Sequence, residues 1–194
     1  ADFIVNIVTN SRRELLRAFA GDLEEAFYEG VKLVDEMYKV PIERRADVVV
    51  VSPGGHPFDI DLYQAHKAVD DALEAVKRGG VIVWAAECQD GHGNEVFYDW
   101  MTRFKDVKEM EAEIKRHFRL GGHKAYYLAR SLEKVQIILV STLPDYHAVG
   151  TFRLRTARAL NDALRDAFDV VGKDGKVWVM PYGNITLPIV HSSE

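Results

Sequence analysis

The chain has 194 residues, 47% of them apolar, and a net charge of -5 at pH 7. This length supplies one domain with a full core, or one domain with a small appendage. Acidic and basic residues are interspersed, which argues against a nucleic-acid surface, and no apolar run approaches the roughly 20 residues of a membrane helix. The single cysteine, Cys88, excludes a disulfide within the chain. We therefore expect a cytoplasmic protein with no nucleic-acid or membrane partner.

Residues 1–42 predict a ββα unit. Residues 3–9 and 15–20 have strand patterns, and Asp22 is a suitable N-cap for a helix that Pro41 would stop. This unit is expected to be a separate lobe, an edge extension of the domain that follows, or a linker to a missing N-terminal domain.

Residues 43–194 predict strands that alternate with helices. Continuous apolar runs indicate buried strands at 48–51, 81–86, 136–140 and 176–180. Helical spacing indicates helices at 61–78, 94–104, 106–118, 123–133 and 151–168. This alternation predicts an α/β fold, with a mostly parallel central sheet flanked by helices in three Rossmann-like layers. Ligands bind beyond the carboxyl ends of the strands in such sheets.

The familiar self-contained active-site motifs are missing from the sequence. The loop 52–57 does not match G-x-G-x-x-G, and the chain has no P-loop, no G-x-S-x-G elbow and no zinc motif. The seven histidines show no metal-ligand spacing. We therefore expect no metal ligands within this chain.

The loop and helix start after the first buried strand form the most informative segment. Gly54 and Gly55 allow a sharp turn and the close approach of a ligand. Gln64 and Lys67 are three residues apart and so share one helix face. A cation in the first two turns opposes the helix dipole by about 0.3–1 kcal/mol, and an anion shared between the helix N-terminus and the ammonium would offset this cost. Alternatively, Lys67 is a surface lysine balanced by Asp71.

The segment 52–68, with its Gly-Gly loop and Asp-Leu-Tyr-Gln-Ala-His-Lys helix start, resembles the signature of the C-terminal domain of the nickel-dependent lactate racemase family. Weaker similarities at 19–22, 80–88 and 182–188 extend the resemblance over essentially the whole chain. The resemblance implies a two-domain racemase or epimerase that acts on a small 2-hydroxy acid or a related polyol.

The resemblance also implies a nickel-pincer nucleotide in the cleft between the two domains, with hydride transfer between substrate and cofactor. The N-terminal domain, which this chain lacks, would hold the cofactor and supply the catalytic histidines. This chain would bind the substrate carboxylate through Gln64 and Lys67. It would carry no catalytic residue and be inactive alone.

Further residues are expected to line the cleft. These candidates are Gly54, Gly55, His56, Tyr63, His92 and His123. A tryptophan is common in the family in a segment like 122–130, and His123 stands closest to it here. This departure leaves open a substrate other than lactate.

Two other functions fit the sequence. One is a non-catalytic α/β module that binds an anionic metabolite or mediates assembly, and the other is a free-standing hydrolase or transferase that uses Glu87 or Cys88. The racemase hypothesis predicts an open face around Gln64 and Lys67. The binding-module hypothesis predicts a closed pocket in the isolated chain.

Overall fold

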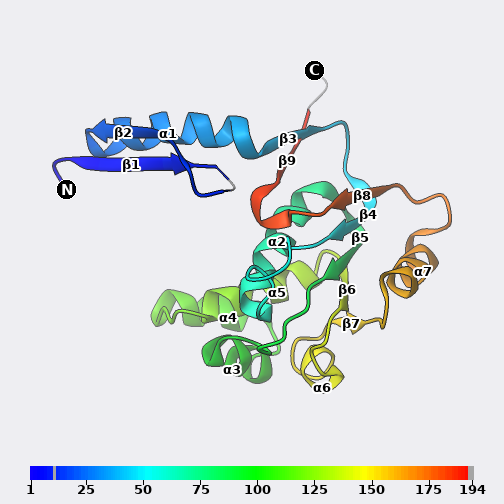
Figure 1. The fold of residues 1–194 in the computed structure, drawn as a ribbon. Helices are drawn as coiled ribbons and strands as arrows, with labels where there is room; N and C mark the ends of the chain where they lie inside the picture. The colour runs from blue at the N-terminus through cyan, green and yellow to red at the C-terminus, as the bar shows by residue number, and fades with distance from the viewer. Residues whose placement is uncertain (11, 192–194) are drawn as a thin grey trace. The chain divides into compact units, whose positions relative to one another are not determined.

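The computed structural model describes residues 1–10 and 12–191 (Figure 1). It divides the chain into two compact units, Ala1–Val40 and Pro41–Glu194. None of the helices in the described residues combines the length and apolar character needed to span a membrane.

The first unit is a β-hairpin covered on one face by a helix. Strands β1 (Ile4–Thr9) and β2 (Leu15–Gly21) are antiparallel, and α1 (Leu23–Tyr38) packs on both of them. Asp22 caps α1, because its Oδ1 accepts the N–H groups of Glu24 and Glu25 at 2.9 and 3.2 Å. The predicted ββα elements are therefore present, although α1 ends at Tyr38 and not at Pro41, because β3 (Lys39–Ile42) begins at the next residue.

The second unit contains a five-stranded sheet in which every pair of neighbours is parallel. Its spatial order is β7 (Arg155–Thr156), β6 (Gln136–Val140), β5 (Val76–Ala85), β4 (Ala46–Val51) and β8 (Val177–Met180). The end of β3 belongs to this unit and forms a separate two-stranded sheet with β9 (Leu187–Val190).

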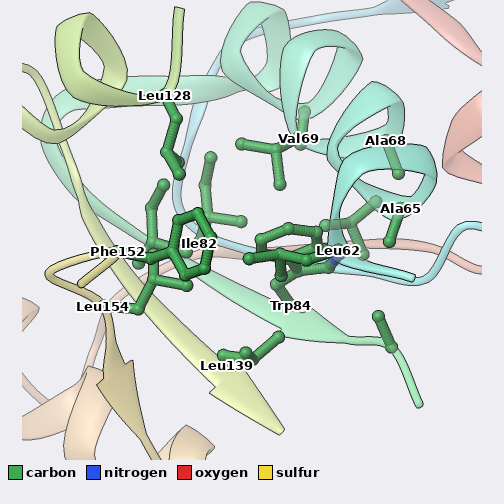
Figure 2. Packing of buried hydrophobic residues seen from close by; sticks show 14 of the residues in the cluster. Leu62, Ala65, Ala68, Val69, Ile82, Trp84, Leu128, Leu139, Phe152 and Leu154 are labelled. Atoms are coloured by element: carbon green, nitrogen blue, oxygen red, sulfur yellow. The ribbon is translucent and has the colours of Figure 1, made fainter. Parts of the chain in front are cut away.

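Both faces of the five-stranded sheet are buried, which makes three layers. One face packs against α2 (Leu62–Ala75) and α5 (Gly122–Leu132), as Figure 2 shows for Val69 and Leu128 above Ile82. The opposite face, which includes Val48 and Val83, packs against α7 (Leu160–Val171). Strands buried on both faces read as unbroken apolar runs. The predicted three-layer α/β fold is therefore confirmed.

Shorter elements surround this core. Helices α3 (Glu95–Arg103) and α4 (Val107–Arg116) precede α5, and α6 (Asp145–Ala148) follows β6. The 3-10 helix η1 (Gly183–Ile185) connects β8 to β9, and both η1 and β9 pack on α2.

Two predicted helices are wrong in extent. The helix predicted at 61–78 ends at Ala75, because Val76 already pairs with Ala46 as the first residue of β5. The helix predicted at 151–168 begins only at Leu160. Arg153, in the expected first turn of this helix, has a positive φ, which a helix does not allow. Its guanidinium donates to the backbone carbonyls of Met101 and Phe104 at the end of α3.

Candidate functional site at the carboxyl edge of the sheet

The order of the strands reverses beside β4. The chain runs from β4 through β5 and β6 to β7, and then returns to place β8 on the other side of β4. The loops that leave β4 and β8 are joined, since Ser52 N–H donates to Met180 O at 3.0 Å and Gly183 N–H donates to Ser52 O at 2.7 Å. Such a reversal, beyond the carboxyl ends of parallel strands, is where α/β sheets bind ligands.

The Gly-Gly loop after β4 needs its glycines. Gly54 has φ of 110° and Gly55 has φ of 78°, and the added Cβ of any other residue at Gly54 would lie 3.2 Å from the Tyr182 ring. His56 is exposed in the same loop. Tyr182, which was not among the predicted site residues, therefore lies against this loop. Its position at the end of β8 was the available signal.

Two backbone N–H groups in the first turn of α2 are already hydrogen-bonded within the protein. Asp61 is the N-cap and accepts the N–H of Gln64 at 2.7 Å, while the N–H of Leu62 donates to Gly91 O at 3.0 Å. Gly93 makes room for this cap, because a Cβ there would overlap the Asp61 carboxylate. The N–H groups of Leu62 and Gln64, which the helix N-terminus was expected to direct at an anion, are therefore occupied. The negatively charged carboxylate of Asp61 also lies beside them. An anion would therefore bind more favourably to side chains further along the helix than to these backbone N–H groups.

Gln64 and Lys67 meet on the outer side of α2. Lys67 Nζ donates to Gln64 Oε1 at 2.9 Å, and Lys67 is exposed while Gln64 is half-buried. The ammonium keeps two further N–H donors, and the carboxamide keeps its NH₂ group. Among the described residues Lys67 has no ion pair, with Asp71 or any other carboxylate. The pair therefore presents several N–H donors and one positive charge to solvent.

This surface is open. One hollow of about 310 Å³ is lined by residues that include Arg78 and Lys134, and another of about 290 Å³ is lined by residues that include Lys105 and Arg155. Neither includes Gln64 or Lys67. Lys67 is exposed, as the racemase hypothesis expects, and neither of these two hollows is the closed pocket that the binding-module hypothesis predicts.

The remaining candidate side chains pack against their neighbours. The Tyr63 ring lies 6.0 Å from the Phe97 ring, and His92 places Nε2 3.2 Å from Glu95 Oε1. His123 stacks on Phe118 with ring centroids 5.7 Å apart. None of the three forms a hydrogen bond with Gln64 or Lys67 in the residues that the structure describes.

The pKa of His123 is shifted by its surroundings. Burial lowers the pKa of this imidazole, and the nearby positive charge of Lys124 lowers it further. Nδ1 of His123 accepts the N–H of Gly121 at 3.4 Å. His123 is therefore favoured in its neutral form.

A buried ionic cluster next to the site was missed by the sequence analysis. Lys124 of α5 is 8% exposed, and its Nζ lies 3.5 Å from Asp70 Oδ2 and 3.3 Å from His66 Nδ1. His66 is fully buried and also lies 3.3 Å from Asp70. The cluster joins α5 to the helix that carries Lys67. The signal was a lysine amid the apolar stripe of α5, together with the His-x-x-x-Asp spacing on α2.

The pKa values within this cluster follow from its burial and charges. Burial lowers the pKa of Lys124, although Asp70 opposes this shift. Burial acts to raise the pKa of Asp70, but the hydrogen bond from His66 and the charges of His66 and Lys124 outweigh it, so the pKa is lowered. Asp70 is therefore the counterion of the cluster.

Cys88 is poorly suited to act as a nucleophile. It is 1% exposed, and burial raises the pKa of its thiol to about 12. The thiolate, which is the reactive form, is therefore scarce near neutral pH. Glu87 is exposed at the same strand end, where its backbone carbonyl accepts the hydroxyls of Ser141 and Thr142. This arrangement does not support a hydrolase built on Cys88.

Replacing Asp71 by asparagine is expected to stabilise the chain in a pH-dependent way. Burial raises the pKa of Asp71 from 3.8 to about 6, and the charge of Asp70 adds to the shift. Because the folded chain holds this proton to a higher pH than the unfolded chain does, stability is lost as pH rises between these two values. We expect Asp71→Asn to raise the free energy of unfolding by about 1 kcal/mol above that window.

Urea unfolding at about pH 3.5 and about pH 7.5 measures this difference, and the Asp71→Asn gain should be confined to the higher pH. An equal gain at both pH values would mean that Asp71 does not titrate as its burial implies.

The all-parallel sheet, with its strand reversal and open edge, defines a three-layer α/β domain of the kind that binds ligands at its carboxyl edge. A family model for the lactate racemase C-terminal domain matches residues 42–187. The chain belongs to this family, which confirms the resemblance seen in the sequence.

Individual relatives agree with this assignment. The lactate racemase of Thermoanaerobacterium thermosaccharolyticum is 37% identical over 185 residues, and that of Lactiplantibacillus plantarum is 33% identical over 185 residues. Each match covers 93% of this chain and 43% of the relative. The chain therefore spans less than half the length of the curated relatives it matches.

Solved structures show the same fold. The structure of the lactate racemase apoprotein from T. thermosaccharolyticum matches with a TM-score of 0.87 and 35% identity, over 97% of this chain and 46% of that one. A Thermotoga maritima protein matches with a TM-score of 0.63 and 16% identity, over 97% of this chain and 49% of that one. The second likeness shows the fold alone.

Proposed function

We propose that this chain is the part of a 2-hydroxy-acid racemase or epimerase that holds the substrate carboxylate, in a cleft completed by a domain outside this chain. The observation that carries the proposal is the bonded pair of Gln64 and Lys67 on an open face of α2, with Lys67 free of any ion pair in the described residues. The names of the two relatives, both lactate racemases, support the substrate class.

The chemistry of the pair suits a carboxylate. An ammonium and a carboxamide offer N–H donors to two oxygen atoms, and hydrogen bonds to charged groups contribute about 1.5–3 kcal/mol each. Because Lys67 already donates to Gln64 Oε1, the amide is oriented with its NH₂ group away from the ammonium bond. The two side chains are therefore arranged before the ligand arrives, which reduces the entropy lost on binding.

The cofactor of the proposed enzyme would lie elsewhere in the protein. No group of three or more His, Cys, Asp or Glu side chains within the described residues could hold a metal ion. These residues do not fit a nickel site. We propose that a nickel-pincer nucleotide and the catalytic groups belong to the N-terminal domain, that the isolated chain is inactive, and that the protein is cytoplasmic.

The loop residues at the carboxyl edge would shape the cleft around the substrate. Gly54 adjoins the exposed ring of Tyr182, and we propose that Gly54, Gly55, His56 and Tyr63 face the missing domain. We propose His92 and His123 as more distant contacts. A small 2-hydroxy acid satisfies the carboxylate site, and a larger hydroxylated substrate would use these outer residues.

A titration with two matched ligands tests the proposed function. Lactate carries a carboxylate, and lactamide is its neutral isostere. We expect lactate, and not lactamide, to shift the NMR signals of the Gln64 side-chain amide and the Lys67 ammonium. Lys67→Met and Gln64→Glu should each weaken lactate binding by about ten-fold or more. Equal shifts with both ligands, or unchanged affinity in both variants, would refute carboxylate binding at this pair.

A further inference from the structure

The hairpin of the first unit has one apolar face that nothing in that unit covers. Antiparallel pairing places Val5 opposite Ala20 and Ile7 opposite Ala18. With Phe3 and Leu16, which share the same alternation, these residues define what we name the outer face. The four large side chains of the outer face are between 49% and 64% exposed, and both alanines are exposed as well. None of the six residues is charged.

The other side of the hairpin shows what a covered face looks like. Val8 points to that side and is buried, and the Phe19 ring lies within 3.5 Å of the position that a Cβ on Gly30 of α1 would take. Exposed apolar residues that are scattered need no explanation, but a contiguous apolar face marks an interaction surface.

The strand edges of the hairpin also indicate that the first unit can make further contacts. β1 and β2 form a sheet of only two strands, so each leaves one edge without a strand partner in the described residues. A two-stranded hairpin is marginal by itself and open edges invite further pairing. Helix α1 covers one face only. The unit therefore leaves one sheet face and two strand edges available for further contacts in the described residues.

The comparisons with known proteins indicate which assembly this is. The model of the lactate racemase C-terminal domain begins at residue 42, so the hairpin unit lies outside it. The two curated relatives nevertheless match 93% of this chain, which includes most of the hairpin unit. Since this chain covers 43% of each relative, more than half of a lactate racemase lies outside it.

From these observations we infer that the outer face is the docking surface for the rest of the lactate racemase polypeptide, the portion outside the C-terminal domain. The first unit is then a fragment of that portion, carried on the same chain as the C-terminal domain. This inference rests on the proposed two-domain organisation, but it is independent of carboxylate binding at Gln64 and Lys67.

Thiol labelling tests the docking surface directly. Cys88 is the only cysteine and is buried, so it reacts slowly in the folded chain. Ile7→Cys places a thiol at the centre of the outer face. Val149→Cys places one at a site of comparable exposure in the second unit. Both variants are made in this chain alone and in this chain joined to the unmatched portion of the T. thermosaccharolyticum enzyme.

We expect the thiol at position 7 to react quickly in the isolated chain and about ten-fold or more slowly in the joined protein. The thiol at position 149 should react alike in both, and slow labelling of Cys88 reports that the joined protein is folded. Mixing the two polypeptides, instead of joining them, gives a second measurement that does not depend on the fusion.

Three results would overturn the inference. Equal labelling at position 7 with and without the unmatched portion would show that this portion does not dock there. Protection in the isolated chain that disappears on dilution would make a second copy the occupant. Protection in the isolated chain at every concentration would mean that its own second unit covers the face. The lactate titration decides carboxylate binding separately in each case.

Discussion

Replacing Lys67 by methionine in a two-domain protein of the proposed kind is expected to lower kcat/KM for the proposed 2-hydroxy-acid substrate by about 100-fold. Methionine keeps the length of the side chain but removes the positive charge and the bond from Nζ to Gln64 Oε1. If the pair binds as proposed, the substrate carboxylate then loses its ammonium donors, and the carboxamide loses the contact that orients it. Racemisation of a single enantiomer, followed by polarimetry, measures the change.

Lys77→Met is the matched control for this experiment. Lys77 is also a surface lysine, but it pairs with Asp47 at 2.6 Å and lies near the opposite end of the sheet from the Gly-Gly loop. Its removal should leave kcat/KM unchanged. A full-length Lys67→Met protein with ordinary kinetics, or a Lys77→Met protein with an equal loss, would contradict the role proposed for Lys67.

Replacing Lys124 by methionine is expected to lower the free energy of unfolding by about 2 kcal/mol. The change leaves Asp70 without its buried ammonium partner and His66 without one of its two polar contacts. Loss of one member of a fully buried pair costs about 3–5 kcal/mol, and the partial exposure of Asp70 reduces this cost. Urea unfolding of the chain measures the effect.

Lys115→Met is the control that separates the effect of losing a buried ion pair from the effect of losing a positive charge. Lys115 pairs with Glu111 at 2.7 Å, but the lysine side chain is 71% exposed, and such pairs contribute at most about 1 kcal/mol. Adding Asp70→Asn to Lys124→Met should recover part of the lost stability, because it removes the unpaired carboxylate. If both lysine variants lost the same stability, the buried cluster would have no special energetic role.

Much of the fold could be predicted because local chemistry and tertiary structure agree. The valine run 48–51 indicated a strand buried on both faces, and β4 is such a strand. Asp22 indicated a helix start, and it caps α1. The spacing of Gln64 and Lys67 predicted a shared helix face, and the two side chains are hydrogen-bonded. In the second and third cases the deciding contact is local in the sequence, and in the first the apolar run itself indicates burial on both faces.

The errors arise where distant contacts decide the structure. Phe152 and Leu154 lie within the helix predicted at 151–168, yet both are buried in the main core by a non-helical segment that leads into the short edge strand β7. The N–H of Leu62 is satisfied by Gly91 from another loop, which no local pattern indicates. Lys124 was missed because a lysine in an amphipathic helix is normally exposed, and its partners lie on α2.

Gln64 and Lys67, the two residues proposed to bind the substrate carboxylate, lie on one turn of α2, which Asp61 caps at its start. Because one helix carries both residues, any movement of this domain against another would move their two backbone positions together. In a two-domain enzyme of the proposed kind, the distance from this pair to a group on the other domain would then depend on how far the two domains close. Substrates of different length would then be accommodated by different degrees of domain closure, and not by a different spacing of Gln64 and Lys67.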